Sequence, residues 1–114
     1  MKSRTRIIGA IMTESEFHRA VEGVLSRVED ALERFDALDL DSEGGVLTIG
    51  CPGGARIIVN RQVPLREIWV AAPSGGFHYR HDGRSWVDTR GGPELFAALA
   101  ALLARHGGTT VDFG

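Results

Sequence analysis

Carboxylates are concentrated in one short stretch of this chain, from Glu29 to Glu43. Only one base, Arg34, stands among them. We call the seven acids the acidic ridge: Glu29, Asp30, Glu33, Asp36, Asp39, Asp41 and Glu43. So many like charges side by side lower stability through self-repulsion, which raises the question of what they are for. Carboxylate oxygens are ligands for hard cations, and a row of them also complements a basic protein surface.

The residues that lead into the ridge have the spacing of an amphipathic helix. Apolar side chains recur from Phe17 to Phe35 at intervals typical of a helix, over about five turns. On a helical wheel, most of the bases fall on one flank of this apolar stripe. The other flank carries His18, Glu22, Glu29, Glu33 and Asp36. The alternative interpretation is a solvated helix face that only keeps the protein soluble, but it does not explain why so few of these acids have a base beside them.

Other patterns that could do chemistry are weak. The stretch Asp39–Gly44 matches the first half of a calcium-binding EF-hand loop, but Gly50 stands where that loop needs its last glutamate. The single cysteine, Cys51, excludes an internal disulfide and a Cys-rich metal site, so we interpret it as a structural thiol. His78 and His81 are not spaced to share a metal ion. No nucleophile can be grouped with a base and an orienting residue, so we expect a protein that is not an enzyme.

The overall composition is that of one globular domain with an uneven charge distribution. The chain has 114 residues, 43% of them apolar, and a net charge of −2. No apolar run approaches the roughly 20 residues that span a bilayer, and no signal peptide is evident, so we expect a cytoplasmic protein without a membrane partner. Residues 12–43 hold ten acids and three bases, whereas residues 44–114 hold five acids and seven arginines. This acidic first third disfavours nucleic acid as the main partner.

Capping residues and hydrophobic periodicity predict the elements that must position the ridge. Thr13 and Glu16 form a capping box that starts the first helix, so residues 1–11 are expected to be a flexible tail before a domain of residues 12–114. A second helix is expected from Pro93, with Glu94 in its first turn, to the glycine pair at 107–108. Residues 110–113 either return as a short strand or pack down. Between the helices, turn residues separate five predicted strands: Val46–Cys51, Arg56–Arg61, Ile68–Ala72, Phe77–Arg80 and Trp86–Thr89.

These elements predict a two-layer α+β sandwich. Two amphipathic helices with one apolar stripe each are expected to cover one face of an antiparallel sheet of about five to six strands. The other face is then left in solvent. Trp69 is expected there as part of a docking patch, although the periodicity alone is equally compatible with a buried tryptophan. The other members of the predicted patch are Asn60, Arg61 and Gln62.

A different use of the sheet surface is a single-stranded RNA-binding module. In that alternative, Trp69, Phe77 and Tyr79 would stack on bases, with arginines nearby. The order of the elements differs from that of the common RNA-binding sandwich, and the acidic ridge would repel phosphate. We therefore rank this alternative second.

Four segments of the chain resemble the bacterial frataxins. They are MTESEFHRAVEGVL, SEGGVLTIG, RIIVNRQVPLREIWVAAPSGGFHYRHDGRSWVD and the closing ELFAALAALLARHGG, so that the resemblance covers residues 12–114. It implies an α-β sandwich with two helices on one side of an antiparallel sheet. It also implies weak, reversible binding of ferrous and ferric iron (Fe2+ and Fe3+) and docking on the cysteine desulfurase and the scaffold protein of iron–sulfur cluster assembly. In that process the protein would act as an iron donor or as a regulator. A ferroxidase or iron-storage enzyme is a third possibility, but no buried carboxylate–histidine constellation in the sequence supports it.

The resemblance also implies roles for particular residues. The acidic ridge corresponds to the iron-binding acids of the family, and His18 to a histidine that has been linked to metal binding. Asn60, Gln62 and Trp69 match the family's sheet-surface motif, and Glu33 and Asp36 would take part in partner binding. We expect a monomer, with oligomers formed in the presence of iron left open. Arg34 and Arg66 depart from the residues usual in the family, and the linker after the first helix is shorter, so the capacity for iron is expected to be lower.

Overall fold

The structure is a computed structural model that describes residues 12–114. In this part of the chain, two α-helices flank six strands, and a short 3-10 helix, η2 Pro52–Gly54, connects β2 and β3. The predicted tail, residues 1–11, lies outside the described residues. The element bounds are α1 Glu14–Leu32, β1 Asp39–Glu43, β2 Val46–Gly50, β3 Arg56–Gln62, β4 Glu67–Ala72, β5 Gly75–His81, β6 Trp86–Asp88 and α2 Leu95–Gly107.

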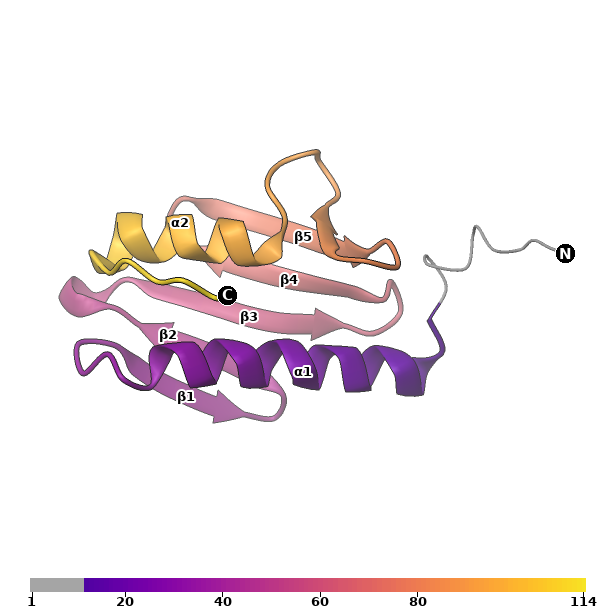
Figure 1. Cartoon of the computed structure of the whole chain (residues 1–114), viewed down its shortest axis with the longest axis horizontal. Coiled ribbons are helices and arrows are strands. Elements are labelled where there is room, and N and C mark those ends of the chain that lie inside the picture. The colour runs from indigo at the N-terminus through magenta and orange to yellow at the C-terminus, as the bar shows by residue number, and fades with distance from the viewer. Residues whose placement is uncertain (1–11) are drawn as a thin grey trace, which may run out of the picture.

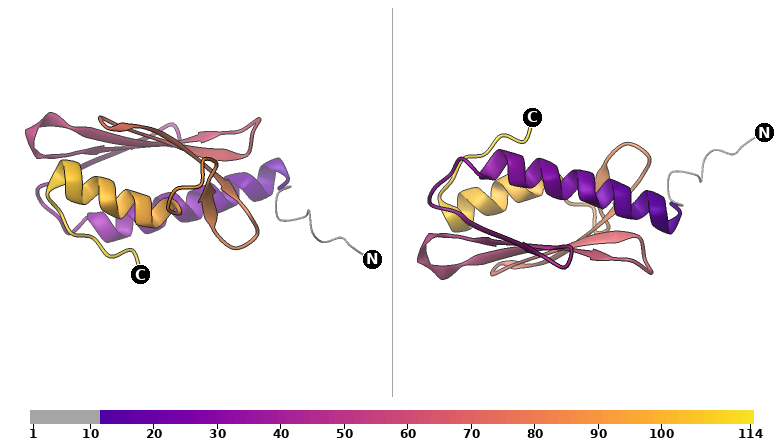
Figure 2. Two further views of the ribbon diagram at one scale, coloured as in Figure 1. Left: turned by 90° about the horizontal axis from the view of Figure 1, so that it is seen from above. Right: turned by 90° about the horizontal axis from the view of Figure 1, so that it is seen from below.

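The six strands form one antiparallel sheet in which the spatial order is the chain order, from β1 to β6. Both helices lie on the same side of this sheet, as the face-on view (Figure 1) and the two edge-on views (Figure 2) show together. The predicted two-layer sandwich is therefore confirmed. We call the sheet face turned away from the two helices the open face.

Alternation along the strands decides which side chains face the helices. On β3, Ile57 and Val59 are fully buried, and on β4, Ile68 and Val70 belong to the same buried layer. Because successive side chains of a strand point to opposite faces, the residues between them point to the open face. A shift of one residue in register would exchange the two sets, so the apolar alternation fixes what the open face displays.

The start of α1 follows the predicted capping box. The Thr13 hydroxyl accepts a hydrogen bond from the Glu16 backbone at 3.1 Å, and the Glu16 carboxylate accepts one from the Thr13 backbone at 2.9 Å. The helix then buries one apolar stripe against the sheet: Phe17, Val21, Val24, Leu25, Val28 and Leu32. It ends at Leu32, about one turn before the periodicity had suggested, and Glu33 is its C-cap.

The start of α2 and the end of the chain differ in detail from the predictions. Pro93 and Glu94 precede α2, and Glu94 is the N-cap, with its carboxylate accepting a hydrogen bond from the Ala97 backbone at 3.0 Å. The last residues pack down without forming a strand. The final segment runs back between the two helices (Figure 1), where the Arg27 guanidinium donates two hydrogen bonds, of 2.9 and 2.7 Å, to the Phe113 carbonyl.

The strand β1 is not among the five predicted strands, because Asp39–Glu43 carries the acids at the end of the ridge and lacks an apolar alternation. The structure pairs it with β2 along its whole length, from Asp39 opposite Gly50 to Glu43 opposite Val46. Gly44 and Gly45 form the turn with φ angles of 62° and 80°, the left-handed conformation that a two-residue hairpin turn of this kind requires. The second half of the ridge is thus an edge strand of the sheet.

Candidate functional site

The first half of the acidic ridge surrounds the C-terminal end of α1. Glu29 and Asp30 belong to the last turn of the helix, whereas Glu33 caps it and Asp36 lies in the turn that follows. Asp30, Glu33 and Asp36 are exposed, and Glu29 is partly buried. The last turn contains no basic residue. Because the C-terminal end of a helix is its negative pole, these carboxylates stand where the helix itself disfavours them.

The second half of the ridge lies on the open face. On β1, Leu40 faces Ile49 and packs against the core, so the residues on either side of it point the other way. Those residues are Asp39 and Asp41, followed two positions later by Glu43, and all three are exposed. Beside them, the open face has a hollow of about 440 Å³ with Asp39 and Asp41 on one side and Arg56 on the other. The ridge therefore turns around the edge of the sheet, from the helix layer to the open face.

The ridge is an open surface and does not form a preassembled chelate. Within residues 12–114, no three histidine, cysteine, aspartate or glutamate side chains are grouped so that they could hold a metal ion. In the same part of the chain, none of the seven ridge acids has an arginine, lysine or histidine within 4.0 Å. The ridge carboxylates are thus available to a ligand from outside, at the cost of their mutual repulsion.

His18 lies apart from the ridge. It is near the start of α1, eleven residues before Glu29, which corresponds to about 16 Å along a helix axis. The Arg61 guanidinium donates hydrogen bonds to His18 Nδ1 at 2.8 Å and to Glu22 Oε2 at 2.5 Å. Since arginine can only donate, the Nδ1 lone pair of His18 is already used. The structure does not bring this predicted metal ligand together with the others.

The open face displays Trp69 between two neighbouring strands. It lies opposite Asn60 on β3 and opposite His78 on β5. The indole ring stacks on the His78 imidazole with 4.3 Å between the ring centroids and 10° between the planes. A hollow of about 210 Å³ beside this pair is lined by Asn60, Ala71 and Gly76 among others. Trp69 is partly buried by these neighbours, so it is less exposed than we expected.

Two residues of the predicted docking patch share the open face with Trp69, and one does not. Asn60 and Gln62 alternate with buried residues of β3 and point to the open face. Arg61 points to the helix side, where only 14% of its side chain is exposed and where it holds α1 to β3. A Cβ atom at Gly45, in the β1–β2 turn, would lie 3.3 Å from the Arg61 guanidinium, a tight contact that adds to the preference for glycine set by the φ angle of 80°.

The aromatic platform of the RNA-binding alternative is not formed. Tyr79 is fully buried and Phe77 packs against the core, since both point to the helix side of β5. Only Trp69 of the three predicted stacking residues lies on the open face. Tyr79 is opposite the buried Ile68, whereas Trp69 is the next residue after Ile68 and therefore points to the other face. Tyr79 and Trp69 thus lie on opposite faces of the sheet.

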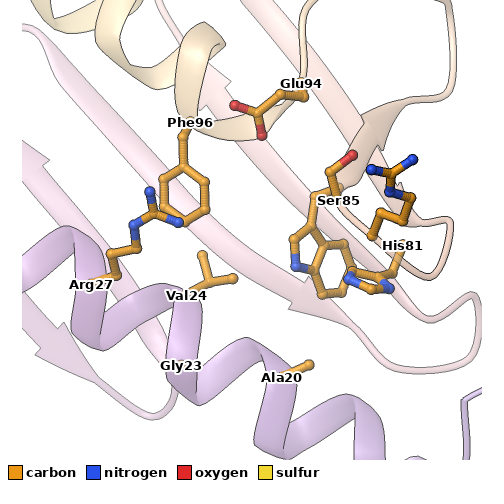
Figure 3. A pocket seen from close by; sticks show the side chains of 10 residues that line it. Ala20, Gly23, Val24, Arg27, His81, Ser85, Glu94 and Phe96 are labelled. Atoms are coloured by element: carbon orange, nitrogen blue, oxygen red, sulfur yellow. The ribbon is translucent and has the colours of Figure 1, made fainter. Parts of the chain in front are cut away.

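A third hollow, of about 380 Å³, lies between α1, the β5–β6 turn and the start of α2. Figure 3 shows Arg27 and Phe96 on one side of it and His81 and Ser85 on the other. The Arg27 guanidinium lies 4.0 Å from the centre of the Phe96 ring and holds the C-terminal segment, so its charge is used inside the fold.

Cys51 is buried outside this hollow, and burial raises the pKa of its thiol, which agrees with a structural role.

A comparison with models of known protein families shows which family this chain belongs to. A family model described as the frataxin-like domain matches residues 10–109. This chain belongs to the frataxin family. The resemblance inferred from the four sequence segments is therefore confirmed.

Individual members of the frataxin family are similar over nearly their whole length. A protein of Cupriavidus metallidurans is 46% identical over 105 residues, which cover 88% of this chain and 95% of that protein. A protein of Janthinobacterium sp. (strain Marseille) is 48% identical over 106 residues, with 88% and 95% covered. Both are named iron-sulfur cluster assembly protein CyaY. The solved structure of frataxin from Psychromonas ingrahamii matches with a TM-score of 0.84 and 32% identity, covering 90% of this chain and 99% of its own.

Two residues on the open face were missed as members of a site. The sequence patterns indicated neither His78 nor Glu67 as part of a docking surface. Glu67 lies two residues before Trp69, and this spacing was the available signal, because residues two apart on a strand share a face. The position of His78 opposite Trp69 depends on the register of β4 and β5, which the sequence does not show. Within residues 12–114, neither helix is both long and apolar enough to cross a membrane.

Proposed function

We propose that this frataxin family member is an iron-binding accessory protein of iron–sulfur cluster assembly, which supplies iron to the cysteine desulfurase and its scaffold or regulates the desulfurase. The observation that carries the proposal is the acidic ridge around the end of α1 and along β1, whose carboxylates form no ion pair with any base of residues 12–114. The names of the relatives, which are 46% and 48% identical, support the process in which we place it.

The chemistry of the ridge suits a metal that is held briefly. Carboxylate oxygens bind Fe2+ and Fe3+ as hard ligands, and exposed carboxylates keep the bound ion in contact with water. Because the ridge acids are not grouped into a cage, binding is expected to be weak and exchange fast. The iron is cargo in this account. A site of this kind can accept an ion and release it to a partner.

The same charges would guide the protein to a basic partner. Attraction between a negative ridge and a positive patch speeds association and weakens as salt screens it, over a Debye length of about 8 Å at physiological ionic strength. We therefore propose that the ridge, including Glu33 and Asp36, faces a basic surface of the desulfurase. The open face with Asn60, Gln62 and Trp69 provides a second, less charged contact for the partner complex.

Charge reversal tests this docking role. The double variant Glu33→Lys/Asp36→Lys should bind the desulfurase about tenfold more weakly at low salt, and the difference should shrink at high salt. Lysine after the C-terminal end of α1 favours the helix dipole, so the variant is expected to fold. The affinity is measured by titration calorimetry at two salt concentrations.

A matched control separates the position of the charges from their number. Glu14→Lys/Asp112→Lys changes the net charge equally at two exposed residues that are outside the ridge. It should bind nearly as tightly as the unmodified protein. Equal affinities for the two double variants would contradict a docking role for the ridge.

A further inference from the structure

The open face contains one carboxylate that is almost completely buried. Glu67, the first residue of β4, is only 3% exposed although it points away from both helices. An ionised side chain without water around it is costly unless it is paired and hydrogen-bonded. What covers Glu67 is therefore informative about what it does.

The two oxygens of Glu67 are divided between two partners. Oε1 accepts a hydrogen bond of 2.9 Å from the Trp69 indole nitrogen, and Oε2 accepts one of 2.6 Å from Arg80 Nη2. His78 Nδ1 lies 4.0 Å from Oε1, and the His78 ring is stacked on Trp69. The indole is thus held at its one polar atom by Glu67 and at its flat face by His78.

The charges around this group favour an ionised Glu67. Arg80 and His78 approach it from β5, while its direct neighbour on β3 is the uncharged Gln62. Burial by itself would raise the pKa of Glu67, but the hydrogen bonds from Trp69 and Arg80 and the charge of Arg80 outweigh it and lower the pKa below the ordinary value. The bond to the indole therefore persists through the neutral and mildly acidic range.

A tryptophan held in one orientation binds a partner with less loss of entropy than one that must be ordered on contact. The indole of Trp69 can rotate about two side-chain bonds, and a bond at its nitrogen together with a stack on its face removes that freedom. Neither helix packs on the open face, so the hydrogen bond to Glu67 and the stack on His78 are the contacts that fix the orientation of the Trp69 ring.

We propose that Glu67 is a positioning residue that holds Trp69 flat on the open face, in the orientation in which this face docks on its protein partner. This inference rests on the proposed function, because it takes the open face to be a docking surface. It adds that the partner meets a preformed aromatic stack of Trp69 and His78 with a guanidinium, that of Arg80, at its border. Arg80 is 52% exposed and remains reachable.

The first test needs no partner. In 15N-labelled protein carrying Trp86→Phe, the remaining indole N–H resonance belongs to Trp69, since the chain has two tryptophans. Glu67→Ala should speed hydrogen exchange of that N–H about tenfold, which corresponds to the loss of one charge-assisted hydrogen bond. Asp112→Ala, which removes an exposed carboxylate from the last segment of the chain and away from the open face, is the control and should leave the exchange unchanged. Unchanged exchange in Glu67→Ala would overturn the positioning role.

A rescue variant separates positioning from general destabilisation. Glutamine can still accept the indole hydrogen bond through its amide oxygen, but beside Arg80 it would turn that oxygen to the guanidinium. The variant is therefore Glu67→Gln/Arg80→Ala. It should restore slow exchange even if Glu67→Ala melts at a lower temperature. Fast exchange in this folded double variant would overturn the proposal.

The second test measures affinity for the desulfurase–scaffold complex. Glu67→Ala should bind about three- to tenfold more weakly, the cost of ordering one free side chain, and Trp69→Ala should bind more weakly still. Weaker binding by Trp69→Ala together with full affinity in Glu67→Ala would overturn only the positioning role of Glu67 and would leave the docking role of the open face intact. Full affinity in both variants would overturn the docking role of the open face, whatever the exchange data show.

Discussion

Tyr79 is the residue whose buried position has the clearest consequence for titration. It is fully buried, and within residues 12–114 its hydroxyl has no hydrogen-bond partner. Burial, with the negative charges of Asp88 and Glu94, raises the pKa of Tyr79 to about 12. In the unfolded chain the pKa is about 10. Below pH 10 both states are protonated, so stability is unaffected; between pH 10 and about 12 the unfolded state alone loses its proton, so stability falls.

This expectation is simple to measure, because Tyr79 is the only tyrosine. Absorbance at the tyrosinate band, followed with circular dichroism as a check on folding, should show no ionisation until well above pH 10. Tyr79→Phe should lose the fall in stability that begins there and should cost little at neutral pH, since the hydroxyl makes no bond. A midpoint near 10 in the folded protein would contradict the buried position.

The contacts of Arg61 could not be predicted from the sequence. Its neighbours Asn60 and Gln62 suggested a shared docking patch, and the alternation of the strand already implied that Arg61 points the other way. What the sequence does not show is the receiving site: His18 and Glu22 are about forty residues earlier, and only packing of α1 on β3 brings them to the guanidinium. Contacts of this kind depend on the tertiary arrangement.

At the scale of elements, the C-terminal end of α1 carries acids where the helix dipole is negative and where Glu29 and Glu33 are one turn apart. Replacing both by neutral side chains, Glu29→Gln/Glu33→Gln, should therefore raise the free energy of unfolding by about 0.6 to 2 kcal/mol. The same variant should bind iron less well. Urea unfolding measures the first effect.

A control at the opposite end of α1 should have the opposite sign. Glu14→Gln/Glu16→Gln removes two acids from the positive end of the helix and replaces the Glu16 carboxylate of the capping box, so it should destabilise the fold. If neutralisation at both ends had the same sign, the dipole argument would be wrong. If Glu29→Gln/Glu33→Gln makes the fold more stable, the ridge acids lower stability in the natural protein, which would indicate that they are retained for function.

The elements that could be predicted are those with an apolar pattern. The two α-helices have apolar stripes and the strands β2 to β6 have apolar alternation, and each pattern can be buried in only one arrangement. Their predicted positions were confirmed within a few residues. The strand β1 was missed because its sequence, DLDSE, has one apolar residue and three acids. Backbone pairing with β2 and the Gly44–Gly45 turn hold it, and its charges discourage pairing with another chain at that edge.

For the whole molecule, the fold separates two surfaces of different character. The acidic ridge lies at the β1 edge and the end of α1, and the open face presents the Trp69–His78 stack several strands away. The sequence indicated both sets of residues. It did not indicate that the ridge bends around the edge of the sheet, because that depends on β1 being a strand whose acids point away from the helices. A partner complex that lies on the open face can contact Asp39, Asp41 and Glu43 as well as Trp69, and it can contact the α1 half of the ridge only by reaching around this edge.

The central claim, that the ridge binds iron, is tested most directly by adding Fe2+ without oxygen to 15N-labelled protein and following each amide by NMR. Paramagnetic ions broaden nearby resonances, and we predict broadening of residues 29–43 with little effect near Trp69. His18→Ala should give the same pattern, because His18 is about 16 Å from Glu29 along α1. Spectra that stay sharp at several equivalents of Fe2+, or broadening centred on His18, would contradict the account.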